Sequence, residues 1–244
     1  MILSQFNVPS ASLKADISVY VLLPDCITAD MDTLYLLHGA MEKPSVLLSK
    51  STLSELADHY QTAVILPAMG NGFYVDAAHE FLCNELVKYI QKEYALSLNR
   101  EHTLIGGNSM GGYGALYNGM KRPDIFGAVF SLSGALDLSY GITFVRYLDA
   151  KLPDYLNKPK AQLISEYDLV PLLSNQAKQQ YYLSCGKDDF LIDINRKFVS
   201  ILNQNNIAYT YVEEAGNHDW DYWRKALVNV FEWNRLRERY VNSI

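Results

Sequence analysis

The sequence lacks the features that mark several classes of protein. Only three of its 244 residues are cysteines and none forms a Cys-x-x-Cys pair, which argues against a disulfide framework and for a reducing compartment. No run of lysine or arginine stands out and the net charge is −6, so binding to a phosphate backbone is not expected. His-Glu-x-x-His and other zinc-ligand spacings are absent, and we expect neither a metal nor a cofactor.

Segments that direct a chain to a membrane are also missing. The opening stretch, MILSQFNVPS, holds neither the basic region nor the long apolar region of a signal peptide. No apolar run is long enough to span a bilayer. We therefore expect a cytoplasmic protein without nucleic-acid or membrane partners, and the sequence leaves open whether it forms a homo-oligomer.

What the sequence does have is a large apolar fraction arranged in alternating segments. With 49% apolar residues, the chain is able to bury one full core, and we expect a single domain over residues 1–244. Short apolar segments alternate with segments whose apolar residues recur every three or four positions, as in amphipathic helices. This alternation predicts an α/β fold with a mostly parallel central sheet and helices on both faces. The expected strands cover 16–24, 32–39, 62–68, 102–108, 127–134, 180–186 and 207–216, and amphipathic helices are expected at 77–94, 193–205 and around 223–231.

One segment, residues 136–175, interrupts the alternation. It is too long for a simple link, and it contains three prolines and several aromatic residues. Long excursions in compact domains are often lids or binding loops. A cap- or lid-like insertion beside a binding pocket is one interpretation, and a helical excursion that only covers the edge of the sheet is the other.

The stretch LIGGNSMGGYGAL, residues 104–116, carries the strongest chemical signal. Its Gly107-x-Ser109-x-Gly111 pattern falls between an apolar strand and a helix, which is the context of a nucleophile elbow. A sharp turn there would lift Ser109 out of the sheet, and side chains at the flanking glycine positions would clash. A glycine-rich turn with a helix-capping serine is the structural alternative. A phosphate loop is disfavoured because no lysine follows the glycines.

A serine nucleophile needs a general base and an acid that orients the base. On a strand–turn–helix scaffold of this kind the acid and then the histidine follow the serine along the chain. His218 lies between the last expected strand and the last helix and is the candidate base, whereas the other four histidines are expected to be surface or packing residues. Asp189 is the preferred acid because of its spacing from Gly186, and Asp188 is the alternative.

Stabilising a tetrahedral intermediate requires two backbone N–H donors. One is expected from Met110, the residue after the nucleophile. The other is expected from the loop after the second core strand, where we assign Ala40 and keep Met41 as the alternative. Gly39 would let this backbone approach the substrate closely.

With these residues in place, the sequence resembles the esterase D/tributyrin esterase group of α/β-hydrolases over nearly its whole length. The segments YLLHGA, GNSMGGYGAL, SCGKDDFL and GNHDWDYWRKAL are similar to the oxyanion, nucleophile, acid and histidine segments of that group. The resemblance implies the α/β-hydrolase fold and supports Asp189 as the acid. Two departures stand out: Ala40 replaces a larger residue such as leucine, and the next segment lacks the Trp or Phe expected near the acyl pocket.

The resemblance implies hydrolysis of small-molecule esters with short acyl chains, acetyl or butyryl. Phe73, Tyr74 and the 136–175 segment are the candidate pocket wall. The expected activity is that of a serine carboxylesterase working through an acyl-enzyme. An S-formylglutathione hydrolase-like thioesterase and an acyltransferase remain alternatives on the same scaffold. A non-catalytic binding module would lack a triad member, and all three candidate members are present.

Overall fold

The apolar segments of the sequence become the strands of one mixed sheet. The computed structural model describes residues 1–28, 31–96, 99–148, 151–175 and 179–241. Within these ranges the strand order is β1-β2-β4-β3-β5-β6-β7-β8. β2 pairs antiparallel with β1 and β4, and every other neighbouring pair is parallel. The strands are β1 (Ile2–Ser10), β2 (Ala15–Leu23), β3 (Thr33–Leu37), β4 (Ala63–Pro67), β5 (Thr103–Asn108), β6 (Ala128–Leu132), β7 (Gln180–Gly186) and β8 (Thr210–Glu214).

Burial explains why the central strands were visible in the sequence and β1 was not. Every residue of β3, β4, β5 and β6 is buried, because helices cover both faces of the sheet and leave no solvent-facing side. Such strands read as continuous apolar runs. β1 lies at the edge of the sheet, mixes exposed with buried positions and contains Pro9, so its sequence carries no comparable signal.

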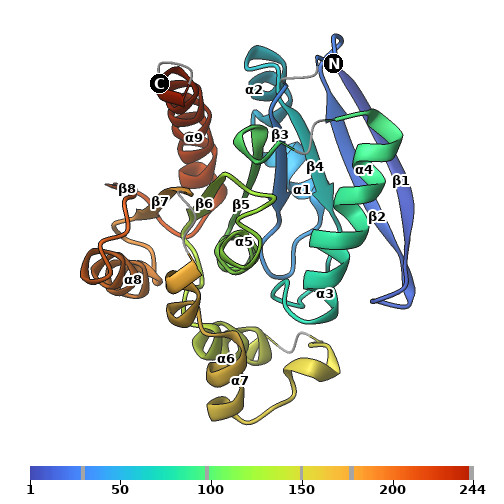
Figure 1. Ribbon diagram of the computed structural model, residues 1–244. Coiled ribbons are helices and arrows are strands. Elements are labelled where there is room, and N and C mark those ends of the chain that lie inside the picture. The colour runs from blue at the N-terminus through green and yellow to red at the C-terminus, as the bar shows by residue number, and fades with distance from the viewer. Residues whose placement is uncertain (29–30, 97–98, 149–150, 176–178, 242–244) are drawn as a thin grey trace.

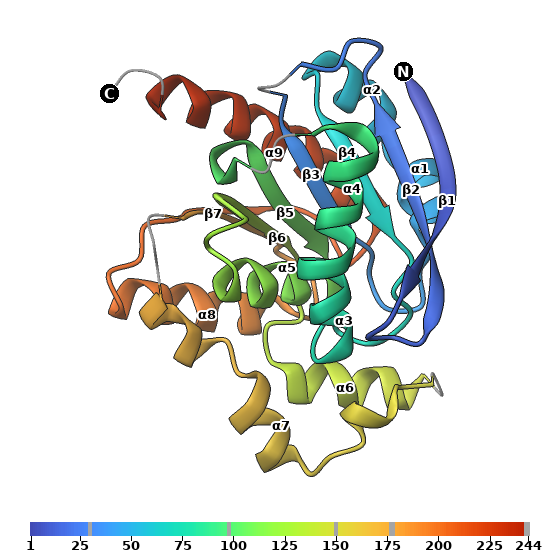
Figure 2. The ribbon, with the colours of Figure 1, turned by 45° about the vertical axis from the view of Figure 1, so that its right-hand side comes forward.

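The helices form two layers, one on each face of the sheet (Figures 1 and 2). On one face, α1, α2 and α9 bury apolar residues such as Leu47, Leu56 and Leu227 in a shared cluster with the strands. On the other face, α4, α5 and α8 do the same with residues such as Ile90 and Leu116. This arrangement confirms the expected α/β-hydrolase fold. The helices are α1 (Pro44–Lys50), α2 (Leu53–His59), α3 (Ala77–Glu80), α4 (Val87–Tyr94), α5 (Met110–Lys121), α8 (Ile192–Gln204) and α9 (Trp220–Val241), with a 3-10 turn η2 (Arg100–His102) before β5.

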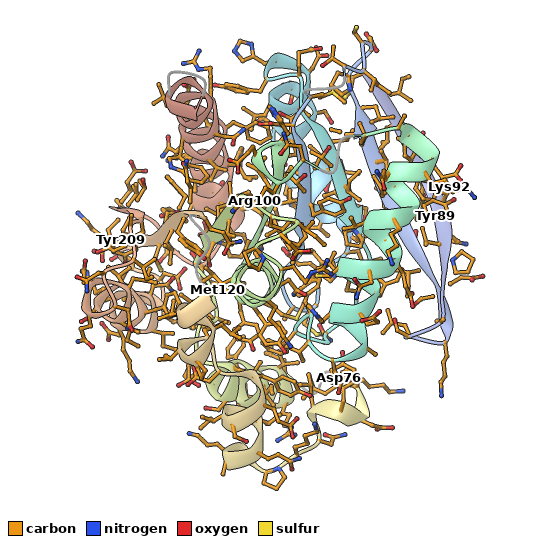
Figure 3. All side chains as sticks on the ribbon, in the orientation of Figure 1. Asp76, Tyr89, Lys92, Arg100, Met120 and Tyr209 are labelled. Atoms are coloured by element: carbon orange, nitrogen blue, oxygen red, sulfur yellow. The ribbon has the colours of Figure 1, made fainter. Side chains whose placement is uncertain are left out.

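The helix expected at 77–94 forms, with one deviation in its middle. Between α3 and α4 the chain makes a π-helical segment, η1 (Phe81–Leu86). The wider turn of a π segment suits the four-residue recurrence of Leu82, Leu86 and Ile90, all of which are buried. On the outer side of α4, Tyr89 projects toward β1, where its ring stacks on Phe6 at a centroid distance of 5.5 Å (Figure 3).

The 136–175 excursion is folded and lies beyond the carboxyl ends of the parallel strands (Figure 2). It connects β6 to β7, and its residues 149–150 lie outside the described ranges. The hydroxyl of Tyr167 donates a hydrogen bond to Asp76 at 3.2 Å, which ties the excursion to the start of α3 (Figure 3). Its elements are α6 (Leu138–Tyr147), η3 (Asp154–Leu156), α7 (Lys160–Tyr167) and η4 (Val170–Asn175).

Candidate active site

Ser109 occupies a strained turn between β5 and α5. Its backbone angles are φ 54° and ψ −116°, a left-handed conformation that a serine adopts only when its surroundings enforce it. The Ser109 N–H donates to Leu132 O at 2.9 Å, and the Ser109 carbonyl accepts from Ala135 N–H at 3.0 Å. These two bonds, to the last residue of β6 and to the segment after it, hold the turn in place, so the serine side chain leaves the plane of the sheet.

The glycines that flank Ser109 are required by close packing. A Cβ at Gly107 would lie 2.4 Å from the carbonyl oxygen of Leu37, and one at Gly111 would lie 2.1 Å from the same atom. Both contacts are with backbone, which is unable to move aside without disturbing β3. The steric argument made from the sequence pattern therefore holds at both positions, because β3, β5 and α5 meet at this point.

Three side chains from distant parts of the chain meet at the carboxyl end of the sheet. The Ser109 Oγ lies 2.9 Å from His218 Nε2, and His218 Nδ1 lies 2.9 Å from Asp189 Oδ2. Because an ionised carboxylate only accepts, the Nδ1 atom carries the proton and the Nε2 atom is free to accept from the serine hydroxyl. Asp189 follows β7 and His218 follows β8, as the strand-order argument required.

Asp189 is held as a buried, ionised carboxylate. Its exposed fraction is 2%, and its Oδ1 atom accepts a hydrogen bond from Leu191 N–H at 2.8 Å. Burial alone would raise the pKa of Asp189, but the hydrogen bond and charge of His218 and the Leu191 N–H bond together hold that pKa below its ordinary value. These contacts therefore favour the charged form of Asp189 beside the imidazole.

The structure places Asp189, and not Asp188, against the imidazole. Asp188 is exposed, and its backbone N–H donates to the carbonyl of Gly216 at 3.0 Å. Asp193, the third acidic residue of this segment, pairs with Arg196 on the surface at 3.7 Å. The geometry thus separates two adjacent aspartates that the sequence left as alternatives.

The two residues expected to supply the backbone donors of an oxyanion site, Ala40 and Met110, line the same cavity as Ser109. Met110 begins α5, so its N–H has no acceptor within the helix. In the loop after β3, the N–H of Met41 donates to Asn71 Oδ1 at 2.8 Å and is already engaged. Among the hydrogen bonds of the described residues, none involves the Ala40 N–H. The geometry therefore favours Ala40 over Met41 as the second donor.

His38 fixes the direction of the Ala40 N–H. Its Nδ1 atom donates to the carbonyl of Gly39 at 2.8 Å, and its Nε2 atom accepts from Met69 N–H at 3.1 Å. The Gly39 carbonyl and the Ala40 N–H belong to one trans peptide and point in opposite directions, so a bond to the first orients the second. Burial lowers the pKa of His38, which keeps the ring neutral as these bonds require.

His38 was expected to be a surface or packing residue; it is buried, and its ring also bonds the backbone of the loop after β3. It is 1% exposed, and its own carbonyl accepts a hydrogen bond from the Tyr74 hydroxyl at 2.9 Å. The signal in the sequence was its place between a buried strand and Gly39. Histidine at such a point supplies a donor and an acceptor from one neutral ring.

A small cavity opens beside the serine, with about 120 Å³ of water-accessible space. Phe73 forms part of its wall. Tyr74 does not line it, contrary to its prediction as part of the pocket wall: the ring is fully buried and its hydroxyl bonds the backbone of His38. Of the 136–175 excursion, α6 supplies wall residues. The full lining is Gly39, Ala40, Glu42, Phe73, Ser109, Met110, Ala135, Tyr140, Gly141, Phe144, Val145, Leu148, Phe190, Leu191, His218 and Trp223.

Aromatic residues that sequence reasoning missed surround the imidazole. The Phe190 ring lies 4.5 Å from that of His218 and 5.1 Å from that of Phe144, and it is 47% exposed. Trp223 packs edge-on against His218 at 4.9 Å. Phe190 directly follows Asp189, and Phe144 lies among the apolar residues of α6. Their positions in the sequence could therefore have marked both as residues near the candidate site.

Two further structural findings concern the described residues alone. No group of three or more His, Cys, Asp or Glu side chains in those ranges is arranged to hold a metal ion. None of the helices described has the length and apolar character needed to cross a bilayer.

Comparison with known proteins assigns the chain to a family. The Esterase family matches residues 10–233 of the chain. An acetyl esterase from Caldicellulosiruptor saccharolyticus is 33% identical over 268 residues, covering 96% of this chain and 98% of the relative. The chain belongs to the Esterase family. This membership confirms the prediction of an enzyme that acts on carboxylic ester bonds.

Solved structures extend the likeness of this esterase at the level of the fold. An S-formylglutathione hydrolase from Staphylococcus aureus superposes with a TM-score of 0.83 at 23% identity, covering 96% of this chain and 98% of the other. An S-formylglutathione hydrolase from Agrobacterium tumefaciens gives a TM-score of 0.79 at 18% identity, with 97% and 99% covered. At such identities the likeness shows a shared fold and does not indicate which substrate this chain acts on.

Proposed function

We propose that this esterase is a serine carboxylesterase that hydrolyses short-chain acyl esters through an acyl-enzyme. The observation that carries the proposal is the unbroken contact from Ser109 Oγ to His218 Nε2 at 2.9 Å, and from His218 Nδ1 to Asp189 at 2.9 Å, beside an open cavity. Such a chain of contacts activates a hydroxyl that is otherwise a weak nucleophile at neutral pH. Placement in the esterase D/tributyrin esterase group is part of the proposal.

The proposed reaction has two halves, formation of the acyl-enzyme and its hydrolysis, and the same three side chains act in both. Ser109 Oγ attacks the ester carbonyl while His218 Nε2 takes its proton, and Asp189 stabilises the imidazolium that forms. The imidazolium then gives the proton to the departing alkoxide, which leaves an acyl-enzyme on Ser109. Water attacks the acyl carbon with His218 again as base, and the acid product departs as Ser109 recovers its proton.

The N–H groups of Ala40 and Met110 would hold the oxyanion. Backbone donors of this kind are fixed before reaction, so they stabilise developing charge without reorganisation. Losing one such donor in other enzymes costs roughly 100- to 1,000-fold in rate. The bonds that His38 and Asn71 make on either side of Ala40 support this role, because they keep its peptide from rotating.

The dimensions of the cavity support a short acyl group. Its volume is about 120 Å³, and Phe73, Gly141 and Val145 form part of its wall. A Cβ on Gly141 would lie 2.8 Å from the Phe73 ring, so the wall is already closely packed there. The similarity to an acetyl esterase supports the same size class.

The decisive experiment combines labelling with a substrate panel. Wild-type protein should react with a fluorophosphonate probe, and Ser109→Ala should not. On p-nitrophenyl acetate, Ser109→Ala should lower kcat by roughly a million-fold, as loss of a triad nucleophile does elsewhere. A loss of less than tenfold would refute the proposal.

The panel then identifies the reaction and its range. Among p-nitrophenyl esters of rising acyl length, kcat/KM should be highest at acetyl to butyryl and fall steeply beyond them. S-formylglutathione, assayed alongside, tests the thioesterase alternative. Product analysis with added alcohol tests acyl transfer, because a transferase would yield a new ester in place of the free acid.

A further inference from the structure

Glu42 brings together three segments that are far apart in the chain. Its Oε2 atom accepts hydrogen bonds from Gly39 N–H at 3.0 Å and from Asn108 Nδ2 at 3.1 Å. Its Oε1 atom accepts from Trp220 Nε1 at 2.7 Å. The side chain is partly buried and forms part of the cavity wall. One carboxylate thus holds three donors at the edge of the candidate active site.

Each donor stands next to a residue of the proposed machinery. Gly39 precedes Ala40, and Asn108 precedes Ser109. Trp220 follows His218 by two residues and begins α9. Glu42 therefore bonds three segments that each follow a different strand. They are the loop after β3 that carries Ala40 (the oxyanion loop), the turn at Ser109 (the nucleophile turn) and the loop that carries His218 (the histidine loop).

Only a carboxylate satisfies all three donors. Both terminal atoms of an ionised Glu side chain accept hydrogen bonds, and neither donates. A Gln side chain would turn its NH₂ group toward one set of donors and lose at least one bond. Bonds to an ionised acceptor are also the stronger kind, which matters for a contact that restrains a loop.

The packing at this point is close enough to transmit a displacement. A Cβ on Gly39 would lie 2.9 Å from Glu42 Oε2 and 3.0 Å from Asn108 Nδ2. The loop between them therefore has little freedom while the carboxylate is present. Without it, the Gly39–Ala40 backbone would lose its link to both β5 and α9.

We propose that Glu42 is a positioning residue that keeps the oxyanion loop in register with the nucleophile turn and the histidine loop. The inference rests on the proposed function, since it concerns the same site. Glu42 acts through Ala40, Ser109 and His218, and its removal should lower kcat rather than raise KM. Misplacement of about 1 Å at an active site is able to cost 100-fold in rate, which sets the scale of the effect.

The test compares Glu42→Ala, Glu42→Gln and a control, Glu55→Gln, on an ester that the wild type hydrolyses. Glu55 is exposed on α2, and Glu55→Gln removes the same charge from the same part of the chain. Glu42→Ala should lower kcat by roughly 10- to 100-fold with KM within about twofold. Glu42→Gln, which retains one acceptor atom, should recover part of the loss, and Glu55→Gln should match the wild type.

A double-mutant cycle with Trp220→Phe tests whether the contacts act as one unit. Trp220→Phe removes the indole donor, and its loss should resemble that of Glu42→Gln. In the Glu42→Ala background the same change should lower kcat by less than about twofold, since residues in one network are not additive. Fully multiplicative losses, or a Glu42→Ala kcat within twofold of wild type, would overturn the inference.

Labelling of Ser109 by a fluorophosphonate separates this inference from the proposed function. Absence of labelling in wild-type protein refutes the proposed function itself. Labelling of wild type, with Glu42→Ala labelled at the same rate, refutes only the role of Glu42. Should Glu42→Ala fail to fold, thermal unfolding will show it, and Glu42→Gln, of equal size, then carries the comparison.

Discussion

The Nδ1 atom of His218 lies 2.9 Å from Oδ2 and 3.0 Å from Oδ1 of Asp189, so both carboxylate oxygens face the imidazole. This contact is buried on the side of the aspartate, whose exposed fraction is 2%. Asp188, one residue earlier, is exposed and takes no part in it. The contrast between two neighbouring aspartates allows a matched pair of substitutions.

Asp189→Asn should lower kcat by roughly 10,000-fold, because an amide stabilises the wrong tautomer of the imidazole and leaves its positive form unsupported. Asp188→Asn, which makes the same chemical change one position away, should leave kcat within about twofold. Steady-state kinetics on an acetyl ester measures both. Equal losses in the two variants would remove Asp189 from the triad.

The dependence of kcat/KM on pH should show one ionisation on the acid side. Hydrogen bonds hold the pKa of Asp189 below its ordinary value against the effect of burial, so this group stays charged as acid is added. The imidazole of His218 must be neutral to accept the serine proton, so added acid should lower kcat/KM through this one group. A plot of log kcat/KM against pH with a limiting slope of two on the acid side would contradict this assignment, because it would require two protonations.

His38→Ala should lower kcat by about 10- to 100-fold, since the Gly39–Ala40 peptide loses the bond that orients it. His38→Asn should retain more activity, because an amide nitrogen is able to replace Nδ1 as donor to the Gly39 carbonyl. Comparing kcat, KM and thermal unfolding for both variants separates orientation from stability. Identical losses in the two variants would show that the donor is unimportant.

Val145→Ala should extend activity toward longer acyl chains by enlarging the cavity at α6. The ratio of kcat/KM for hexanoyl to acetyl esters should rise, while labelling of Ser109 stays near the wild-type rate. Loss of a buried branched side chain should also cost stability, about 1 to 3 kcal/mol.

Gly141→Ala serves as the opposing control to Val145→Ala. Its Cβ would lie 2.8 Å from the Phe73 ring and would reduce the space in the cavity at the same wall. The hexanoyl-to-acetyl ratio should therefore fall. A ratio that moves in the same direction in both variants would show that this wall does not contact the acyl group.

The sequence predicted those parts of the fold and site in which one short segment determines the outcome. The Gly107–Gly111 pattern sufficed for the turn at Ser109, because a strand–turn–helix stretch of this kind already requires small residues at both positions, although the backbone that they meet, at Leu37, belongs to β3. Continuous apolar runs identified the buried strands. The choice between Asp188 and Asp189 was beyond the pattern alone, since it depends on which side chain faces His218 after β7 and β8 align.

Other features required contacts between segments that no single stretch encodes. Tyr74 has the composition of a pocket residue, yet its hydroxyl finds a backbone acceptor and the ring becomes core. His38 reads as packing until the bond to Gly39 is seen. Glu42 gains meaning only when donors up to 178 residues away converge on it. β1 is an edge strand with weak alternation, and its pairing with β2 supplies what its own sequence does not.

The proposed reaction centre and one wall of the cavity come from separate parts of this chain. Four residues of α6 line the cavity, Tyr140, Gly141, Phe144 and Val145, whereas the proposed nucleophile, acid and base come from the loops after β5, β7 and β8. Exchange of that one helix among homologous enzymes would therefore create new specificities while inheriting an intact reaction centre. Hydrolases of this kind would then acquire different natural esters through changes in α6 while the proposed reaction centre stays the same.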